Sequence, residues 1–298
     1  MAFNLSSMKG ALEALEDPKT PEEFKNQEVS LVFFDTETTG LKPTSEIIQI
    51  AARCGDSTYN EYIIPNDGIP KFITGLTGFS LVENKMYNRS GELLKAVSKE
   101  TAVGNFIRYL TSIGGKVILI AHNCFRFDAP MLLTLLNERG MVEEFKTIVT
   151  GFSDTLPLLQ ESLPGRRDHG KDYKLVSLAT EFLGDCCGAH DAMNDVIMMQ
   201  ELVNHPEINI EASAFVQSSK TVVEMFENIK VRLRRVDIQR EYQGLKTQGK
   251  IGISDDLIGR LTSSGIAMED LTSAMRSGGP GAVHELLCEK LKRPTRLN

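Results

Sequence analysis

The alternation of apolar and polar positions predicts an α/β fold for residues 29–206. Short apolar runs rich in β-branched and aromatic residues are typical of buried strands, whereas apolar residues three or four apart are typical of helices. The predicted strands are 29–34, 47–52, 57–65, 116–123 and 147–151, and the predicted helices are 99–113, 128–140, 155–162, 175–184 and 191–204. The first strands can pair as an antiparallel meander and the later ones need helical crossovers, so we expect a mixed sheet.

The pattern changes after His205-Pro206, where recognisable strands end. Helical stretches follow near 212–243, 253–262, 267–276 and 281–292, separated by breaks rich in glycine. The polar N-terminal residues include the helix-start signal Thr20-Pro21-Glu22-Glu23. We therefore expect three parts, which are a partly helical extension (1–28), an α/β domain (29–206) and a small C-terminal helical module (207–298).

The composition is that of a globular protein, since 41% of the 298 residues are hydrophobic and 24% are charged. It excludes a collagen, a fully disordered chain and a disulfide-dense miniprotein. No apolar run reaches the roughly 18 residues of a membrane span, and the N-terminus lacks the apolar stretch of a signal peptide. We therefore expect a protein of the cytoplasm or nucleus that is not secreted and binds no membrane.

The cysteines agree with a reducing compartment. There are five, and none forms a Cys-x-x-Cys pair, which fits free thiols better than a disulfide framework. Cys186 and Cys187 are adjacent, and this spacing suits a turn better than a metal site.

Charge is unevenly distributed along the chain. The net charge is −7, but residues 216–298 hold 14 basic and 10 acidic side chains, which leaves a balance of −11 for residues 1–215. Net charge governs solubility and long-range steering, whereas a cleft filled with cations can bind an anion on an acidic protein. The acidic balance therefore does not exclude nucleic acid as a substrate.

Two acids mark the end of the first predicted strand. Asp35 and Glu37 are two residues apart, so both carboxylates are expected on one face of the strand while Thr36 faces the other way. Hard oxygen ligands on a rigid strand suit Mg²⁺ or Mn²⁺. A pair of solvated acids at a strand end is the alternative.

Three further candidates lie at the starts of predicted helices. Asp128 opens a helix directly after a strand, where an N-cap role is a sufficient explanation. His190 and Asp195 are five residues apart. They can share a site only if His190 lies on the loop before the helix and Asp195 in its first turn, with Asp191 as the N-cap.

Three motifs in this order resemble the DEDDh exonucleases, the DnaQ-like family of the ribonuclease H-like superfamily. They are FFDTETTGL (33–41), AHNCFRFDAPML (121–132) and HDAMND (190–195), and the connecting segments SDTLPLL and KLVSLATEFLG are also similar. Each motif alone is weak, but three in order at these spacings are specific. Within the family the chain is most similar to the three-prime repair exonucleases and the promyelocytic-leukaemia-protein-like exonucleases. It lacks the proline-rich loop found in some repair exonucleases.

The resemblance spans about 29–204 and implies a ribonuclease H-like fold, a mixed five-stranded sheet with helices on both faces. It implies a metal-dependent 3′–5′ exonuclease that releases nucleoside monophosphates with two divalent cations, Mg²⁺ or Mn²⁺. The implied cation ligands are Asp35, Glu37, Asp128 and Asp195, and the implied general base is His190. Four crowded carboxylates repel one another without cations, which agrees with metal binding.

The family motifs also contain candidates for contact with a nucleic acid that has a free 3′ end. The resemblance places Thr38-Thr39-Gly40-Leu41 at the terminal nucleotide, and the alternative is a turn with Leu41 packed inward. Asn123 would orient the site or cap a strand end. Phe125 would stack on a base or pack inside the protein.

Basic side chains are the remaining candidates, since phosphate contacts would offset the acidic charge locally. Arg166, Arg167 and Lys171 crowd one loop, for which a solvated loop is the alternative. Arg232 and Arg235 lie with Gln239 on one face of a predicted helix. That face would hold the substrate strand or be merely solvated. The C-terminal module is also the candidate for binding a protein partner or a second copy of the chain.

We therefore expect an exonuclease that acts on single-stranded DNA, with RNA as the alternative substrate. The alternative function is that of a nucleic-acid-binding or scaffold protein on an inactive exonuclease fold. All five motif residues are present, which favours the enzyme.

Overall fold

A computed structural model describes residues 29–42, 44–184, 188 and 190–291. They fall into two compact units that divide between Phe226 and Glu227. The expected N-terminal extension and the Cys186–Cys187 pair lie outside the described residues.

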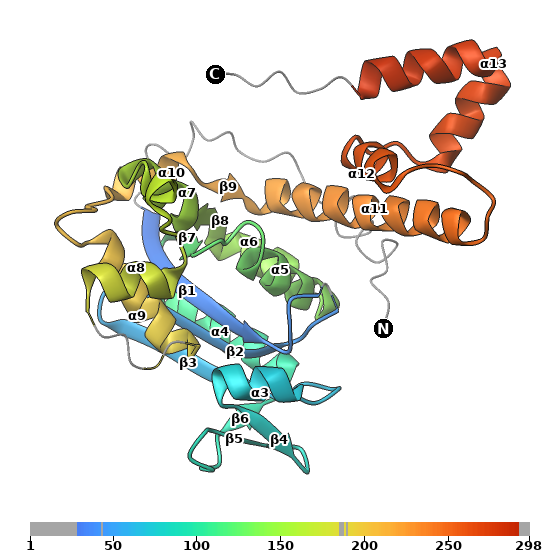
Figure 1. Ribbon diagram of the computed structural model, residues 1–298. Coiled ribbons are helices and arrows are strands. Elements are labelled where there is room, and N and C mark those ends of the chain that lie inside the picture. The colour runs from blue at the N-terminus through green and yellow to red at the C-terminus, as the bar shows by residue number, and fades with distance from the viewer. Residues whose placement is uncertain (1–28, 43, 185–187, 189, 292–298) are drawn as a thin grey trace. The chain divides into compact units, whose positions relative to one another are not determined.

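The first unit is built on a seven-stranded mixed sheet with the strand order β6-β3-β2-β1-β7-β8-β9 (Figure 1). The strands β1, β2 and β3 form the antiparallel meander, and β7 and β8 extend the sheet in parallel with β1. The expected five-stranded sheet is confirmed as these central five strands, and a two-residue strand is added at each edge. The bounds are β1 Val29–Thr38, β2 Ile47–Cys54, β3 Ser57–Ile63, β6 Ala96–Val97, β7 Lys116–Ala121, β8 Val149–Asp154 and β9 Lys220–Thr221.

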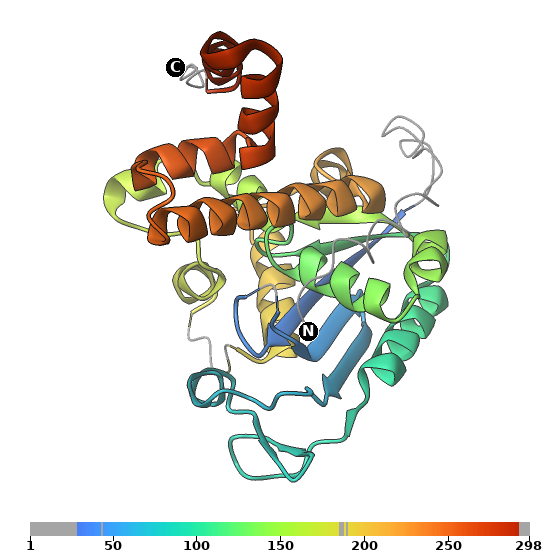
Figure 2. The same ribbon diagram turned by 90° about the vertical axis from the view of Figure 1, so that its right-hand side faces the viewer.

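Helices cover both faces of the sheet (Figures 1 and 2). One layer contains α4 (Lys99–Ile113), α5 (Asp128–Glu138) and α6 (Val142–Ile148). The other contains α7 (Thr155–Ser162), α8 (Leu175–Phe182), α9 (Ala192–Val203) and α10 (Ala212–Gln217).

The alternation of side chains along β1 serves both layers. Phe33 packs into the core that contains Val196 and Met199 of α9. Phe34 faces the opposite way and meets Phe152, which in turn stacks on Phe145 of α6. From Leu31 to Phe34 the central strand is therefore apolar on both faces, and the acids begin directly after it.

A small insertion between β3 and α4 has no counterpart among the predicted elements. It contains α3 (Lys71–Thr77) and the hairpin of β4 (Ser80–Val82) and β5 (Lys85–Tyr87). Its core joins Ile73, Phe79 and Met86 to Ile48 of the main sheet. Elements of three to seven residues show too few periods to be recognised from a sequence pattern.

The segment 207–226, expected in the C-terminal module, packs on the first unit. Phe215 of α10 enters the core and meets Phe33 edge to face, with ring centroids 5.9 Å apart. The strand β9 pairs with β8 at Gly151, where an added Cβ would lie 2.4 Å from the carbonyl oxygen of Lys220. The compact unit therefore extends twenty residues beyond the expected boundary near 206.

The second unit is helical in its described part, as the sequence predicts. It contains most of α11 (Val222–Thr247), together with α12 (Asp255–Ser263) and α13 (Met268–Lys290). α13 is kinked at Gly279, whose φ is 65° and which precedes Pro280, so the predicted break between two helices is confirmed. One core cluster of this unit contains the buried residues Ile238, Tyr242, Ile258, Leu261 and Ile266.

Two further findings concern membrane-spanning helices and the cysteines. Within the described residues, no helix combines the length and apolar character needed to cross a bilayer. Cys54, Cys124 and Cys288 are free thiols, with Cys124 fully buried.

Candidate active site

The site begins at the carboxyl end of β1, where Asp35 and Glu37 follow the buried apolar run. In the antiparallel ladder Asp35 is opposite Ala51 and Glu37 is opposite Gln49, so these side chains share one face of the sheet. This is the face covered by α9, because Ala51 and Ala192 belong to the same core cluster. The expected orientation of the two acids is confirmed.

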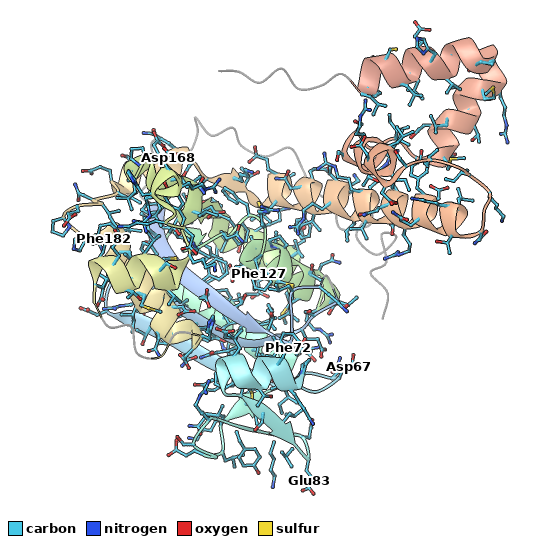
Figure 3. All side chains as sticks on the ribbon, viewed as in Figure 1. Asp67, Phe72, Glu83, Phe127, Asp168 and Phe182 are labelled. Carbon is cyan, nitrogen blue, oxygen red and sulfur yellow. The ribbon has the colours of Figure 1, made fainter. Side chains whose placement is uncertain are left out.

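Asp128 enters from the other helical layer as the first residue of α5. It is 2% exposed, and its Oδ1 accepts hydrogen bonds from the hydroxyl of Thr36 (2.7 Å) and the backbone N–H of Thr36 (3.2 Å). The N-cap position is occupied by Phe127, labelled in Figure 3, without a side-chain cap. The N-cap role for Asp128 is therefore wrong, because its carboxylate is directed to β1.

His190 and Asp195 are brought to the same place by the start of α9. The carboxylate of Asp191 accepts hydrogen bonds from the N–H groups of Met193 (3.1 Å) and Asn194 (3.4 Å), which confirms it as the N-cap. His190 has a φ of 69°, a left-handed backbone that turns the chain into the helix. Asp195 lies in the first turn.

The histidine and two of the acids form a compact cluster. Glu37, His190 and Asp195 each present a ligand atom, and these atoms lie within 4.8 Å of one another. Asp195 Oδ1 is buried and has no hydrogen-bond partner among the residues that the structure describes. A buried carboxylate oxygen without a partner is costly unless a cation or water meets it.

Burial raises the pKa of every acid in this group, and the charges of neighbouring acids add to the effect. Burial raises the pKa of Glu37 to about 8, helped by the charges of Asp195 and Asp128. Burial raises the pKa of Asp195 to about 7, although a hydrogen bond from the backbone of His190 acts in the opposite direction. Burial, followed by the charges of Asp128 and Asp195, raises the pKa of Asp35 well above its usual value. Like charges held together in a desolvated pocket disfavour ionisation.

Two further shifts complete the electrostatics of the site. Burial raises the pKa of Asp128 to about 7, against the hydrogen bonds from Thr36. Burial lowers the pKa of His190, which keeps its imidazole neutral at physiological pH.

These residues fit divalent cations on three grounds. Carboxylate oxygens are suitable ligands for Mg²⁺ or Mn²⁺. The orphaned oxygen of Asp195 needs a partner. Cations would also offset the burial and the repulsion that raise the pKa values of the acids.

The segment after β1 forms a turn that is fixed by its own hydrogen bonds. The hydroxyl of Thr38 donates to the carbonyl of Gly40 (2.7 Å), and the hydroxyl of Thr39 accepts from the N–H of Glu46 (2.9 Å). Leu41 is 85% exposed. The inward packing of Leu41 is therefore wrong, and its apolar side chain is available to a ligand.

Asn123 and Phe125 shape the loop between β7 and α5. Asn123 has a φ of 59°, and its carbonyl accepts hydrogen bonds from the N–H groups of Arg126 and Phe127. Phe125 is half-buried, and Lys220 Nζ lies 4.2 Å from its ring centroid. The strand β9 thus adds a cation to this loop, which the sequence pattern did not indicate.

The basic loop contains the short helix η1 (Arg166–His169) and is largely engaged within the protein. Arg166 is 7% exposed, pairs with Glu181 at 2.9 Å and lies against the rings of Tyr173 and Phe182. These contacts make it an anchor of the loop.

The other two candidates in this loop remain at the surface. Lys171 is half-exposed and pairs with Glu181 at 2.8 Å. Arg167 is exposed, with its guanidinium 5.9 Å from the ring centroid of Tyr173.

Arg232 and Arg235 are exposed on α11, which confirms the helix that was predicted for this stretch. They belong to the second unit. Their contact with a substrate therefore stays a prediction.

The fold and the comparisons with known proteins define the class of the chain. The mixed sheet flanked by helices is ribonuclease H-like, and the relatives include exonucleases, so the chain is similar to the DnaQ-like 3′–5′ exonucleases. The particular family follows from a family model described as the Exuperantia RNase H-like domain, which matches residues 29–180. The chain belongs to that family.

The relatives include proteins with and without an enzymatic name. Protein PML of Mus musculus is 26% identical over 197 residues, which cover 66% of this chain and 18% of the relative. Maternal protein exuperantia of Drosophila melanogaster is 24% identical over 50% of this chain and 30% of its own. Three prime repair exonuclease 2 of Mus musculus is 29% identical over 56% of this chain and 79% of its own. The chain thus spans about a fifth of the length of its PML relatives.

Among solved structures, a zinc-bound complex of E. coli exonuclease I with single-stranded DNA is 18% identical to the chain. It has a TM-score of 0.47 and covers 60% of this chain and 41% of its own.

Proposed function

We propose that the chain is a 3′–5′ exonuclease that removes nucleoside monophosphates from single-stranded DNA. The observation that carries the proposal is the cluster of Glu37, His190 and Asp195 at the end of β1, beside Asp35 and the buried Asp128 that is hydrogen-bonded to Thr36. The acids are Asp35, Glu37, Asp128 and Asp195, and the histidine is His190. The exonuclease relatives support the choice of reaction.

Each residue has a defined task in this reaction. The acids would hold two divalent cations, which supply a nucleophilic water at neutral pH and stabilise charge on the leaving 3′-oxygen. His190 is neutral at physiological pH because burial lowers its pKa. It can therefore accept a proton from the attacking water. Its left-handed backbone places the imidazole beside the ligand atoms of Glu37 and Asp195.

The substrate would be held by residues around the acidic cluster. Leu41 presents an exposed apolar side chain for the terminal base. Phe125, covered by Lys220, and the surface cations Arg167 and Lys171 are suited to the preceding nucleotides.

End-labelled oligonucleotides test this proposal directly. A 3′-labelled single strand incubated with Mg²⁺ should release labelled mononucleotide at once, whereas the same strand labelled at its 5′ end should shorten through a ladder. RNA and duplex DNA assayed beside it define the preference. Asp195→Asn should abolish the products, and Asp168→Asn, which removes an exposed acid of η1, serves as the matched control.

A second candidate function is nucleic-acid binding without hydrolysis. It is favoured by the family match and by relatives whose names state no activity, Maternal protein exuperantia and Protein PML. A wild-type chain that binds the oligonucleotides but releases no product with Mg²⁺ or Mn²⁺ would support this function and refute the first.

A further inference from the structure

One buried amide connects the sheet to the start of α9 and belongs to no part of the machinery described so far. Gln49 lies in β2, is fully buried, and sits opposite Glu37 in the ladder. Its side chain makes three hydrogen bonds. Nε2 donates to Asn60 Oδ1 (3.0 Å) and Asp191 Oδ2 (3.3 Å), and Oε1 accepts from the N–H of Ala192 (3.0 Å).

The chemistry of these partners determines how the amide is oriented. The N–H of Ala192 needs an acceptor, whereas the carboxylate of Asp191 needs a donor. Only an amide with its oxygen toward Ala192 and its nitrogen toward Asp191 meets both demands. A carboxylate at position 49 would place an acceptor against Asp191, and an apolar side chain would serve neither group.

The location of these bonds gives them a functional consequence. Asp191 and Ala192 lie between His190 and Asp195 in the sequence, and they form the N-cap and first residue of α9. The Gln49 amide therefore fixes the point from which both functional side chains extend. Glu37, the third member of their cluster, is on the strand that pairs with β2.

We infer that Gln49 is a positioning residue that sets the distance of His190 and Asp195 from Glu37 and so determines the affinity of the site for divalent cations. The inference rests on the proposed function for its metal site. Groups that orient metal ligands typically change metal affinity by about 10–100-fold when they are replaced. Gln49 acts on the start of a helix and touches neither cation nor substrate.

Mn²⁺ binding measured by calorimetry on the full chain tests the inference without any need for catalysis. Gln49→Glu and Gln49→Met should each weaken Mn²⁺ binding by about 10–100-fold. In activity assays the Mg²⁺ concentration for half-maximal rate should rise by a similar factor, while KM for the oligonucleotide at saturating Mg²⁺ stays within about twofold. A merely structural role would lower the melting temperature without this change in metal dependence.

A reciprocal exchange provides the sharpest control. Asp191→Asn added to Gln49→Glu restores a donor facing an acceptor and keeps a good N-cap residue. The double variant should recover most of the Mn²⁺ affinity, which a double-mutant cycle quantifies. Asn60→Ala removes only the exposed partner in β3. It should change Mn²⁺ affinity less than twofold, since water can replace it.

The possible outcomes separate this inference from the proposed function. Unchanged Mn²⁺ affinity in Gln49→Met and Gln49→Glu refutes the inference and leaves the exonuclease proposal intact. Failure of the double variant to recover affinity, or an equal loss in Asn60→Ala, also refutes it. If wild type binds no Mn²⁺ at all, both are overturned together. Circular dichroism shows which variants are folded. If Gln49→Glu alone does not fold, the Mn²⁺ affinity of the double variant tests the inference in its place.

Discussion

Once divalent cations have been removed, the free energy of unfolding of the first unit should fall as the pH rises. The raised pKa values mean that the folded protein retains protons that the unfolded chain has already released. Where the folded state binds more protons, the free energy of unfolding falls with increasing pH. The window extends from the ordinary carboxyl pKa of about 4 to the folded values of about 7 to 8.

Glu37 alone gives the size of the effect. Its pKa rises from 4.5 to about 8. Between about pH 6 and about pH 8.5 this shift lowers the free energy of unfolding by about 2–3 kcal/mol, at about 1.4 kcal/mol for each unit. For a unit of this size, such a loss lowers the melting temperature by about 5–10 °C.

Scanning calorimetry or circular dichroism is the suitable assay, because the chain has no tryptophan. Protein treated with EDTA should show the decrease with pH. Magnesium at about a hundred times its Kd should restore about 2.7 kcal/mol at the higher pH, and less at the lower pH, where protons compete. Glu37→Gln should flatten the pH dependence and weaken the response to magnesium. The carboxyl pKa values set the test range at about pH 6 to about pH 8.5. The reasoning would be refuted if the melting temperature of the metal-free wild type stays constant or rises over this range.

Three further predictions concern the reaction and its substrate. Asp35→Ala should remove nearly all hydrolysis in the end-label assay while circular dichroism stays native, because it deletes a charged ligand and no core packing. Wild-type turnover would contradict this. His190→Ala should lower the rate by about 10²–10⁴-fold with Mn²⁺ affinity nearly unchanged by calorimetry; affinity lost with activity would make His190 a ligand instead. Arg232→Ala combined with Arg235→Ala should raise KM and flatten the salt dependence of single-strand binding by about 0.7 units of slope per lost contact. Unchanged affinity and slope would exclude α11 as a track for nucleic acid.

Much of the site is predictable from sequence because strand and helix geometry determine it. Asp35 and Glu37 share a face by the period of a strand, and Asp191 caps a helix as its residue type favours. The role of Asp128 could not be derived in this way. Its N-cap interpretation is locally sufficient, whereas its partner Thr36 is 92 residues away and comes from another layer.

Other departures arise from tertiary contacts that override local composition. Arg166 has the sequence context of a mobile basic loop, but Glu181 and two aromatic rings hold it in the interior. The strand β9 has only two residues, too short for any periodicity to be recognised. It forms because Gly151 permits close approach to β8. Because β9 pairs with β8, the first unit extends to Phe226 and not to the expected boundary near 206.

The groups that hold Asp128, Asp195 and the start of α9 are neutral. Asp128 is bound by the hydroxyl and N–H of Thr36, Asp195 by the backbone of His190, and the start of α9 by the amide of Gln49. A lysine or arginine in any of these places would also satisfy a carboxylate, but it would cancel the charge that attracts cations. Neutral donors orient the ligands and leave the repulsion among them unrelieved. Metal affinity and the instability of the metal-free site therefore have a common origin in carboxylates that are buried and crowded together, and removing one of these charges should reduce both.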